Sequence, residues 1–216
     1  MNLINKCFGV LPKIISLFFV YFNRFLFCMV GVKYGSNMRV YNKISITGCG
    51  RIEIGDNFVF TSGASINPIC RNLRGAIYTV RPNSQIKIGD HVGISSSCLW
   101  ALDKITIGNN VKIGGDCIII DNDAHPHDYY IRRAEYGDQH GVDAMLSNVL
   151  ASPVVIEDDV WIGARCQILK GVHIGARSII AAGSVVTKNV PSDVIAGGNP
   201  CKVICPIEKR GSRVCC

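Results

Sequence analysis

The sequence predicts an all-β solenoid, a coil of short strands, preceded by a helical segment. Three observations indicate it: an apolar anchor recurs every sixth position, a small or medium-sized residue lies four positions after each anchor, and glycine often follows the anchor directly. The clearest run of anchors is Ile156, Ile162, Ile168, Ile174, Ile180 and Val186. Earlier runs are Ile54, Phe60 and Ile66, then Ile88 and Ile94, then Ile107, Ile113 and Ile119. Such a fixed internal period is the signature of stacked, repetitive folds.

A period of six matches neither the 3.6-residue turn of a helix nor a helix–turn unit. In a strand, alternate side chains point to the same face, so the anchor and the residue two positions before it both point inward. Glycine after the anchor permits the positive φ that a corner needs. Three such sides give roughly eighteen residues per coil, and each coil buries its interior by stacking on its neighbours.

The small inward positions include three of the eleven cysteines, Cys98, Cys117 and Cys166. The cysteine count is odd, the spacing is scattered and no CxxC pair occurs. We therefore expect these thiols to be packing residues, as in a reducing compartment, and not a disulfide framework.

Residues 1–35 are predicted to form an apolar, basic helical segment. Lys13 and Arg24 bracket ten uncharged residues, whereas a membrane-spanning helix needs about 20. No small-residue cleavage site follows, so a signal peptide is not expected. Two alternatives stay open: the helix packs on the coil, or it lies in a membrane interface where Lys and Arg meet anionic lipid. The second predicts peripheral membrane association through residues 1–35 at the cytoplasmic face.

The net charge of +7 is unevenly distributed. Residues 1–50 hold six cations and no acid, and residues 201–216 hold four cations and Glu208. The segment between them therefore has a small net negative charge, which argues against a nucleic-acid-binding surface. Residues 206–216 are expected to be a C-terminal tail.

The stretch VWIGARCQILKGVHIGARSIIAAGSVVTKNVPSDVIAGGNPCKVI, residues 160–204, resembles the hexapeptide-repeat acyltransferases. Within that family it is most similar to the branch of maltose, galactoside and capsule or lipopolysaccharide O-acetyltransferases. The resemblance covers roughly residues 40–205. It implies a left-handed parallel β-helix over residues 36–205, a homotrimer, and active sites in the clefts between subunits.

The six-residue count holds through Ile119 and fails until Ile156, which predicts a loop excursion at about 120–155. Long excursions from a rigid scaffold often carry function. This one begins with DNDAHPHDYY, residues 121–130, and His125 stands six positions after Ile119. The count therefore places His125 at the next corner of the coil, at the root of the excursion.

By the resemblance, the His-Pro step carries the catalytic base, and His125 matches it. A neutral imidazole can take the proton of a sugar hydroxyl as the hydroxyl attacks a thioester, and a backbone N–H at a corner would hold the oxyanion. Asp121 or Asp123 is expected to fix the imidazole tautomer, and the spacing does not decide between them. His127 is expected to be a loop or acceptor-side residue.

The resemblance also implies acetyl-CoA as co-substrate and no metal. The coenzyme contacts of the family carry over onto Ala164, Ala182, Thr187, Lys188 and Lys202. The two alanines would let the pantetheine arm lie close to the backbone, and the two lysines would neutralise phosphates as point charges.

On the acceptor side, the sugar relatives use an Asn and an Asp from the coil before the histidine. Ser96 stands near the Asn position and Asp103 near the Asp position. Because this chain lacks the Asn, the identity of the acceptor sugar stays open. The resemblance implies direct acetyl transfer to a hydroxyl of a saccharide, or of a polysaccharide or lipopolysaccharide precursor.

Two other activities are alternatives. An amino-sugar N-acetyltransferase would share the fold and the donor, and an amine needs less help from a base. A γ-class carbonic anhydrase would use zinc, and the spacing of 34 residues between His91 and His125 suits it. That family also needs a histidine five positions after the second, where this chain has Tyr130.

Overall fold

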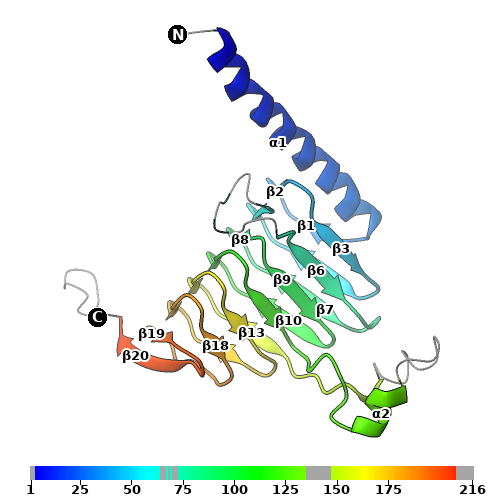
Figure 1. Cartoon of the computed structure of the whole chain (residues 1–216), viewed down its shortest axis with the longest axis vertical. Helices are drawn as coiled ribbons and strands as arrows, with labels where there is room; N and C mark the ends of the chain where they lie inside the picture. The colour runs from blue at the N-terminus through cyan, green and yellow to red at the C-terminus, as the bar shows by residue number, and fades with distance from the viewer. Residues whose placement is uncertain (1–2, 64–66, 68, 70–72, 135–146, 208–216) are drawn as a thin grey trace.

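A long helix, α1 (Leu3–Met29), precedes a stack of short strands that ends in a C-terminal hairpin (Figure 1). The computed structural model describes residues 3–63, 67, 69, 73–134 and 147–207. The strands form three sheets.

The first sheet holds β1 (Lys33–Tyr34), β4 (Arg51–Ile54), β7 (Gln85–Ile88), β10 (Lys104–Ile107), β13 (Val154–Ile156) and β16 (His173–Ile174). The second holds β2 (Arg39–Tyr41), β5 (Val59–Thr61), β8 (Gly93–Ser95), β11 (Lys112–Ile113), β14 (Trp161–Ile162), β17 (Ile179–Ile180), β19 (Val194–Gly197) and β20 (Lys202–Pro206). The third holds β3 (Ser45–Gly48), β6 (Ala76–Thr79), β9 (Cys98–Ala101), β12 (Ile118–Ile120), β15 (Gln167–Ile168) and β18 (Val185–Val186).

From β1 to β15, each strand pairs in parallel with the strand three positions later in the chain, and β17 then pairs in parallel with β19. Successive strands therefore belong to different sheets, and the chain visits all three sheets once per coil. The antiparallel pair β19–β20 ends the stack. This three-sided arrangement of parallel sheets fits the left-handed β-helix that the resemblance implied.

The predicted anchors stack in register and form the core. In the second sheet, Ile113 pairs with Ile162 and Ile162 with Ile180. In the third, Ile119 pairs with Ile168 and Ile168 with Val186. All are fully or almost fully buried. Burial of apolar surface contributes about 25 cal/mol per Å², so the stacked anchors are the main favourable term of the fold.

The predicted inward position of Cys98 is wrong. Cys117 and Cys166 are buried as predicted, but Cys98 lies half-buried on the outer side of β9. Leu99 takes the anchor position, paired with Ile119, and Ser97 takes the small inward position. The unit before Leu99 is one residue short, and a shift of one residue moves every side chain of a strand to the opposite face.

The coil has a second interruption that the repeat count missed. The anchor expected at Ile66 lies outside the described residues. In the third sheet the anchor after Phe60 is Ile77, which pairs with Ile46 on one side and Leu99 on the other. The chain between β5 and β6 is therefore longer than one six-residue unit.

The predicted excursion is confirmed between β12 and β13. Ile107 pairs with Ile156, and Ile156 with Ile174, so the coil resumes in register after it. The short helix α2 (Tyr129–Ala134) lies within the excursion, and residues 135–146 lie outside the described part of the chain.

The C-terminal half of α1 packs on the first coil. Val20, Asn23 and Phe27 recur along one face and are buried. The Asn23 amide donates to the carbonyl oxygens of Val40 and Asn42, at 2.9 and 2.8 Å. The expectation that the segment packs on the coil is confirmed for this half. No helix within the described residues has the length and hydropathy to cross a membrane.

Two neighbouring residues of β12 test the role of the stacked anchors. Ile119→Ala removes a fully buried side chain and is expected to lower the free energy of unfolding by about 2–5 kcal/mol. The matched control Ile118→Ala acts on a side chain that is 40% exposed and should cost less than about 1 kcal/mol. Denaturant unfolding of both variants measures the difference, and equal losses would contradict the assignment of faces.

Candidate active site

The two limbs of the excursion pair with each other at its root. Asn122 and Ala151 form an antiparallel bridge. The Ser152 N–H donates to the carbonyl oxygen of Asp121 at 2.7 Å. The root is therefore an ordered extension of the coil.

The Asp121 carboxylate ties this root to the preceding coil. It is fully buried and accepts main-chain N–H groups from Leu102 and Asp103, both at 2.8 Å, and the Asn122 amide at 3.0 Å. Hydrogen bonds to a carboxylate are about twice as strong as neutral ones. Asp121 therefore fixes main-chain groups of the preceding coil, a role that was not predicted from the sequence.

His125 is exposed on a turn that the root fixes. The preceding Ala124 has φ of 62° and donates its N–H to the Asn122 side-chain oxygen at 2.9 Å. The His125 N–H donates to the Asp123 carbonyl oxygen at 2.7 Å. Pro126 follows and is buried. The imidazole therefore projects from a short turn that is hydrogen-bonded on its N-terminal side and packed on its C-terminal side.

The repeat count put His125 where the next inward anchor falls, and the structure differs. Ile156 fills that position, opposite Ile107. An inward imidazole would be surrounded by isoleucines without polar partners, which costs free energy. The chain leaves the coil before it reaches His125, so the histidine lies at the root of the excursion and outside the stack.

The Asp123 carboxylate contacts two cationic or titratable partners. His127 Nε2 lies 2.8 Å and Lys170 Nζ 3.1 Å from Asp123 Oδ2. Neither contact was predicted from the sequence. The spacing of four residues between Asp123 and His127 was the available signal for the first, and nothing in the sequence pointed to Lys170, which follows β15.

Several predicted residues share one edge of the coil with this root. The edge consists of the segments that follow the strands of the third sheet, and we call it the histidine edge (residues 102–103, 121–126, 169–171 and 187–189). Asp103 lies on it after β9, and Thr187 and Lys188 lie on it after β18, all three with exposed side chains.

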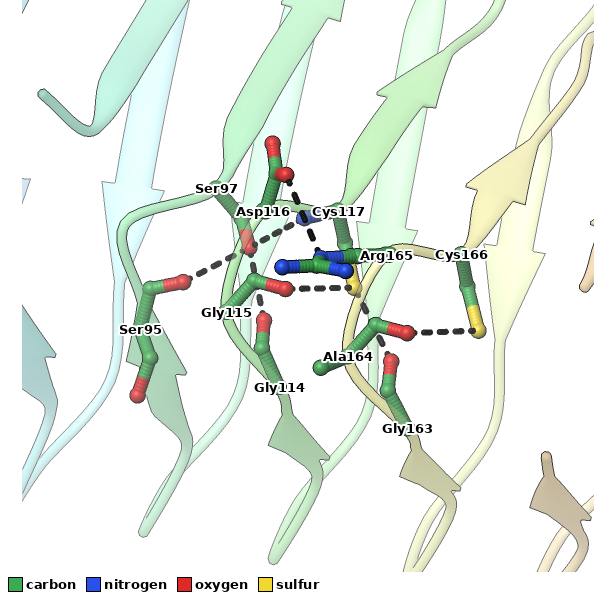
Figure 2. A network of polar contacts seen from close by, with 10 residues as sticks. All are labelled: Ser95, Ser97, Gly114, Gly115, Asp116, Cys117, Gly163, Ala164, Arg165 and Cys166. Atoms are coloured by element: carbon green, nitrogen blue, oxygen red, sulfur yellow. Dashed lines mark hydrogen bonds and ion pairs between the residues drawn. The ribbon is translucent and has the colours of Figure 1, made fainter. Parts of the chain in front are cut away.

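The remaining coenzyme candidates lie on a second edge, formed by the segments that precede the same strands. We call it the alanine edge (residues 95–97, 114–117, 163–166 and 181–184), and Figure 2 shows much of it. Successive coils approach closely here. A Cβ on Gly114 would lie 2.5 Å from the Ala164 nitrogen, and one on Gly163 would lie 2.6 Å from the Ala182 nitrogen. Glycine is required at both positions.

Lys202 lies near the C-terminal end of the alanine edge. It begins β20 and pairs with Gly197 of β19. The N–H of the preceding residue, Cys201, donates to the Val185 carbonyl oxygen at 2.8 Å. Ala164, Ala182 and Lys202 therefore follow one another along the coil axis.

An inward ladder of Ser and Cys side chains fixes the alanine edge from inside (Figure 2). The Ser97 hydroxyl donates to the Gly114 carbonyl oxygen at 2.8 Å, and the Cys117 thiol to that of Gly163 at 3.1 Å. Cys166 repeats the pattern one coil later, with the Ala181 oxygen at 3.2 Å. The adjacent Cys166 thiol and then burial raise the pKa of Cys117, so that thiol stays neutral in its packing role.

Ser96, the other residue predicted on the acceptor side, is buried. It is only 4% exposed, and its hydroxyl accepts the Gly63 N–H at 2.7 Å. The structure therefore brings Asp103 to the histidine edge with His125 and leaves Ser96 inside the alanine edge. No group of three or more His, Cys, Asp or Glu side chains within the described residues is arranged to hold a metal ion.

Residues 153–188 match the family model described as bacterial transferase hexapeptide (six repeats). The chain is 41% identical over 131 residues to a Saccharomyces cerevisiae protein with a provisional acetyltransferase name, an alignment that covers 60% of this chain. The chain spans only 60% of the length of that relative.

Two crystal structures are similar to this one. An N-acyltransferase from Bacillus cereus, AntD, has a TM-score of 0.64 at 21% identity, over 87% of this chain and 90% of AntD. A hexapeptide-repeat containing acetyltransferase from Vibrio cholerae has a TM-score of 0.51 at 26% identity, over 88% and 82% of the two chains. The first similarity shows the fold alone. The family-model match shows hexapeptide repeats over residues 153–188, and the structural similarities show that the chain shares the fold of these acyltransferases.

The role of Asp121 is testable by its removal. Asp121→Ala leaves the N–H groups of Leu102 and Asp103 without their acceptor and is expected to lower the free energy of unfolding by about 2–3 kcal/mol. Asp103→Ala, which removes an exposed carboxylate nearby, should change it by less than about 0.5 kcal/mol. Denaturant unfolding compares the two, and a negligible effect of Asp121→Ala would show that the carboxylate does not hold the root.

Proposed function

We propose that this protein is an acetyl-CoA-dependent O-acetyltransferase that acts on a sugar hydroxyl, with His125 as general base. The observation that carries the proposal is the position of His125, an exposed imidazole on a hydrogen-bonded turn at the root of the excursion. The similarity to hexapeptide-repeat acetyltransferases supports acetyl transfer as the chemistry. The acceptor is a saccharide, or a polysaccharide or lipopolysaccharide precursor.

In this proposal the neutral imidazole of His125 accepts the hydroxyl proton while the hydroxyl oxygen attacks the thioester carbonyl carbon. A backbone N–H of a coil corner holds the negative charge that develops on the carbonyl oxygen. The C–S bond then breaks, and the coenzyme sulfur takes the proton from the imidazolium. The acetyl group passes directly to the acceptor, and no covalent acyl-enzyme forms.

Asp121 and Asp123 have different roles in this proposal. Asp121 positions the turn through the main chain, as its contacts with Leu102 and Asp103 indicate. Asp123 is the carboxylate that stabilises positive charge around the imidazoles, since it already contacts His127 and Lys170.

The coenzyme is proposed to lie along the alanine edge. Ala164 and Ala182 carry small side chains, which leave room for a pantetheine arm parallel to the coil axis. Lys202 stands near the end of that path, where it would meet phosphate charge. AntD, which shares the fold, was crystallised with coenzyme A.

We propose a homotrimer because the residues expected in one active site lie on two edges, one on each side of the third sheet. Thr187 and Lys188 lie on the histidine edge, whereas Ala164 and Ala182 lie on the alanine edge. A second copy packed beside this face would bring its own histidine edge toward the alanine edge of the first. Each active site would then combine residues of two subunits. Light scattering of the purified chain measures the assembly.

The acceptor group is a hydroxyl in this proposal, and Asp103 is the side chain we expect to bind it, since Ser96 is buried. Amines are the alternative class of acceptor. AntD was crystallised with an amino-sugar nucleotide, and its similarity to this chain extends only to the fold. A release assay for the free coenzyme thiol, with matched hydroxyl and amino sugars, separates the two. Turnover with amino sugars alone would overturn O-acetylation.

Replacing the base should reduce turnover sharply. His125→Ala is expected to lower kcat/KM by at least about 100-fold, the lower range of general-base contributions, while acetyl-CoA still binds. The matched control His127→Ala should keep most of the activity, although its imidazole contacts Asp123. Steady-state kinetics measure both. A larger loss in the His127 variant would reassign the base.

A bulky side chain on the alanine edge should obstruct the coenzyme. Ala182→Leu is expected to raise KM for acetyl-CoA by about tenfold, equivalent to about 1.4 kcal/mol of binding, with a smaller effect on kcat. Ala176→Leu makes the same change at the corner after β16 and should leave KM unchanged. If both variants behave alike in steady-state kinetics, the coenzyme does not follow the alanine edge.

A further inference from the structure

Helix α1 has a second apolar face, on the side away from the coil. We call it the outer stripe; its members are Ile14, Ile15, Phe18, Tyr21, Phe22, Phe25 and Met29, and each is between 40% and 70% exposed. The rings of Phe18 and Phe22 stack with their centroids 5.8 Å apart. An exposed apolar surface of this kind, with four aromatic rings in line, marks an interaction site.

The opposite face of the same helix is fixed. At 3.6 residues per turn, the buried Val20, Asn23 and Phe27 lie across the helix from Phe18 and Phe25. Their contacts with the first coil hold α1 as it runs outward from the stack (Figure 1). The outer stripe is therefore presented by a rigid support.

A cationic groove lies beside the outer stripe, between α1 and β2. Its volume is about 430 Å³, and it is lined by Ser16, Leu17, Val20, Tyr21, Arg24, Asn37, Arg39 and Tyr41. The lining holds two guanidinium groups and no carboxylate. Tyr21 belongs to both the groove and the outer stripe, so the two features are continuous.

The guanidinium groups differ in how they are held. Arg24 donates through Nε and Nη2 to the Met38 carbonyl oxygen, at 3.0 and 2.8 Å. Arg39 Nε is buried and has no hydrogen-bond partner within the described part of the chain. A buried donor without an acceptor is costly, and a phosphate oxygen is the acceptor that guanidinium geometry suits best.

We propose that the outer stripe docks on an anionic phospholipid surface and that the groove at Arg24 and Arg39 receives a lipid phosphate. The apolar side chains enter the boundary between headgroups and acyl chains, as in other interfacial helices. The charge of this region complements such a surface, because residues 1–50 hold six cations and no acid. Nearby cations strengthen attachment to anionic lipid.

The same charge argues against a second copy of the chain as the occupant. A symmetric contact between two outer stripes would bring two acid-free, cationic segments together. Neither copy could supply a counter-charge from this region, and like charges in apposition are unfavourable. A phospholipid surface supplies both the apolar phase and the negative charge.

Vesicle sedimentation with the full chain tests the proposal. We expect binding to mixed phosphatidylglycerol and phosphatidylcholine vesicles and much weaker binding to phosphatidylcholine alone. Phe18→Ser combined with Phe22→Ser should lower the affinity by about tenfold or more, and Ile69→Ser, at another exposed apolar side chain, should leave it unchanged. Arg39→Gln should lower it by about fivefold, and the exposed control Lys87→Gln should not.

Equal binding to neutral and anionic vesicles, or no binding at all, would overturn the proposal. So would an unchanged affinity in the Phe18 and Phe22 double variant. If light scattering shows instead that this variant dissociates an assembly that binds no vesicles, the outer stripe is an interface between copies. The assay measures no acetyl transfer, so its failure is independent of the proposed enzymatic activity.

Discussion

The stacking of inward anchors in parallel register is the constraint on which the rest of the structure depends. Neighbouring strands lie about 4.8 Å apart, so each coil repeats its two edges at that interval along the axis. Ile113, Ile162 and Ile180 show the register, with direct pairing from coil to coil. Groups on one edge are thereby held in a line, as an extended coenzyme requires. A rigid stack also gives the excursion a fixed point of departure.

One buried carboxylate anchors the excursion to the stack. Asp121 joins the root to the N–H groups of Leu102 and Asp103, and the turn that presents His125 is built directly on it. The proposed base gains from such support because the position of a base relative to the substrate determines its efficiency. Helix α1 packs on the first coil and presents an apolar surface on its outer side. The proposed active site and the proposed membrane-docking surface therefore lie on different coils.

The fold and the start of the excursion could be predicted because both follow from the six-residue period. The prediction failed where that period is locally broken. One residue is missing before Leu99, so Cys98 and Leu99 lie on the faces opposite to those predicted, and the interruption after Phe60 prevented the prediction of Ile77 as an anchor. The contact of Asp121 with main-chain N–H groups could not be predicted, because any residue type supplies such N–H groups except proline. That the residues proposed for one active site divide between two edges became visible only in three dimensions.

The most direct measurement is the geometry of a ternary complex of this chain with coenzyme A and its saccharide acceptor. The account predicts that a ring nitrogen of His125 lies within about 2.6–3.2 Å of the acceptor oxygen. It also predicts that the pantetheine arm follows Ala164 and Ala182 of one subunit. An acceptor bound to His127, or a coenzyme away from the alanine edge, would contradict it.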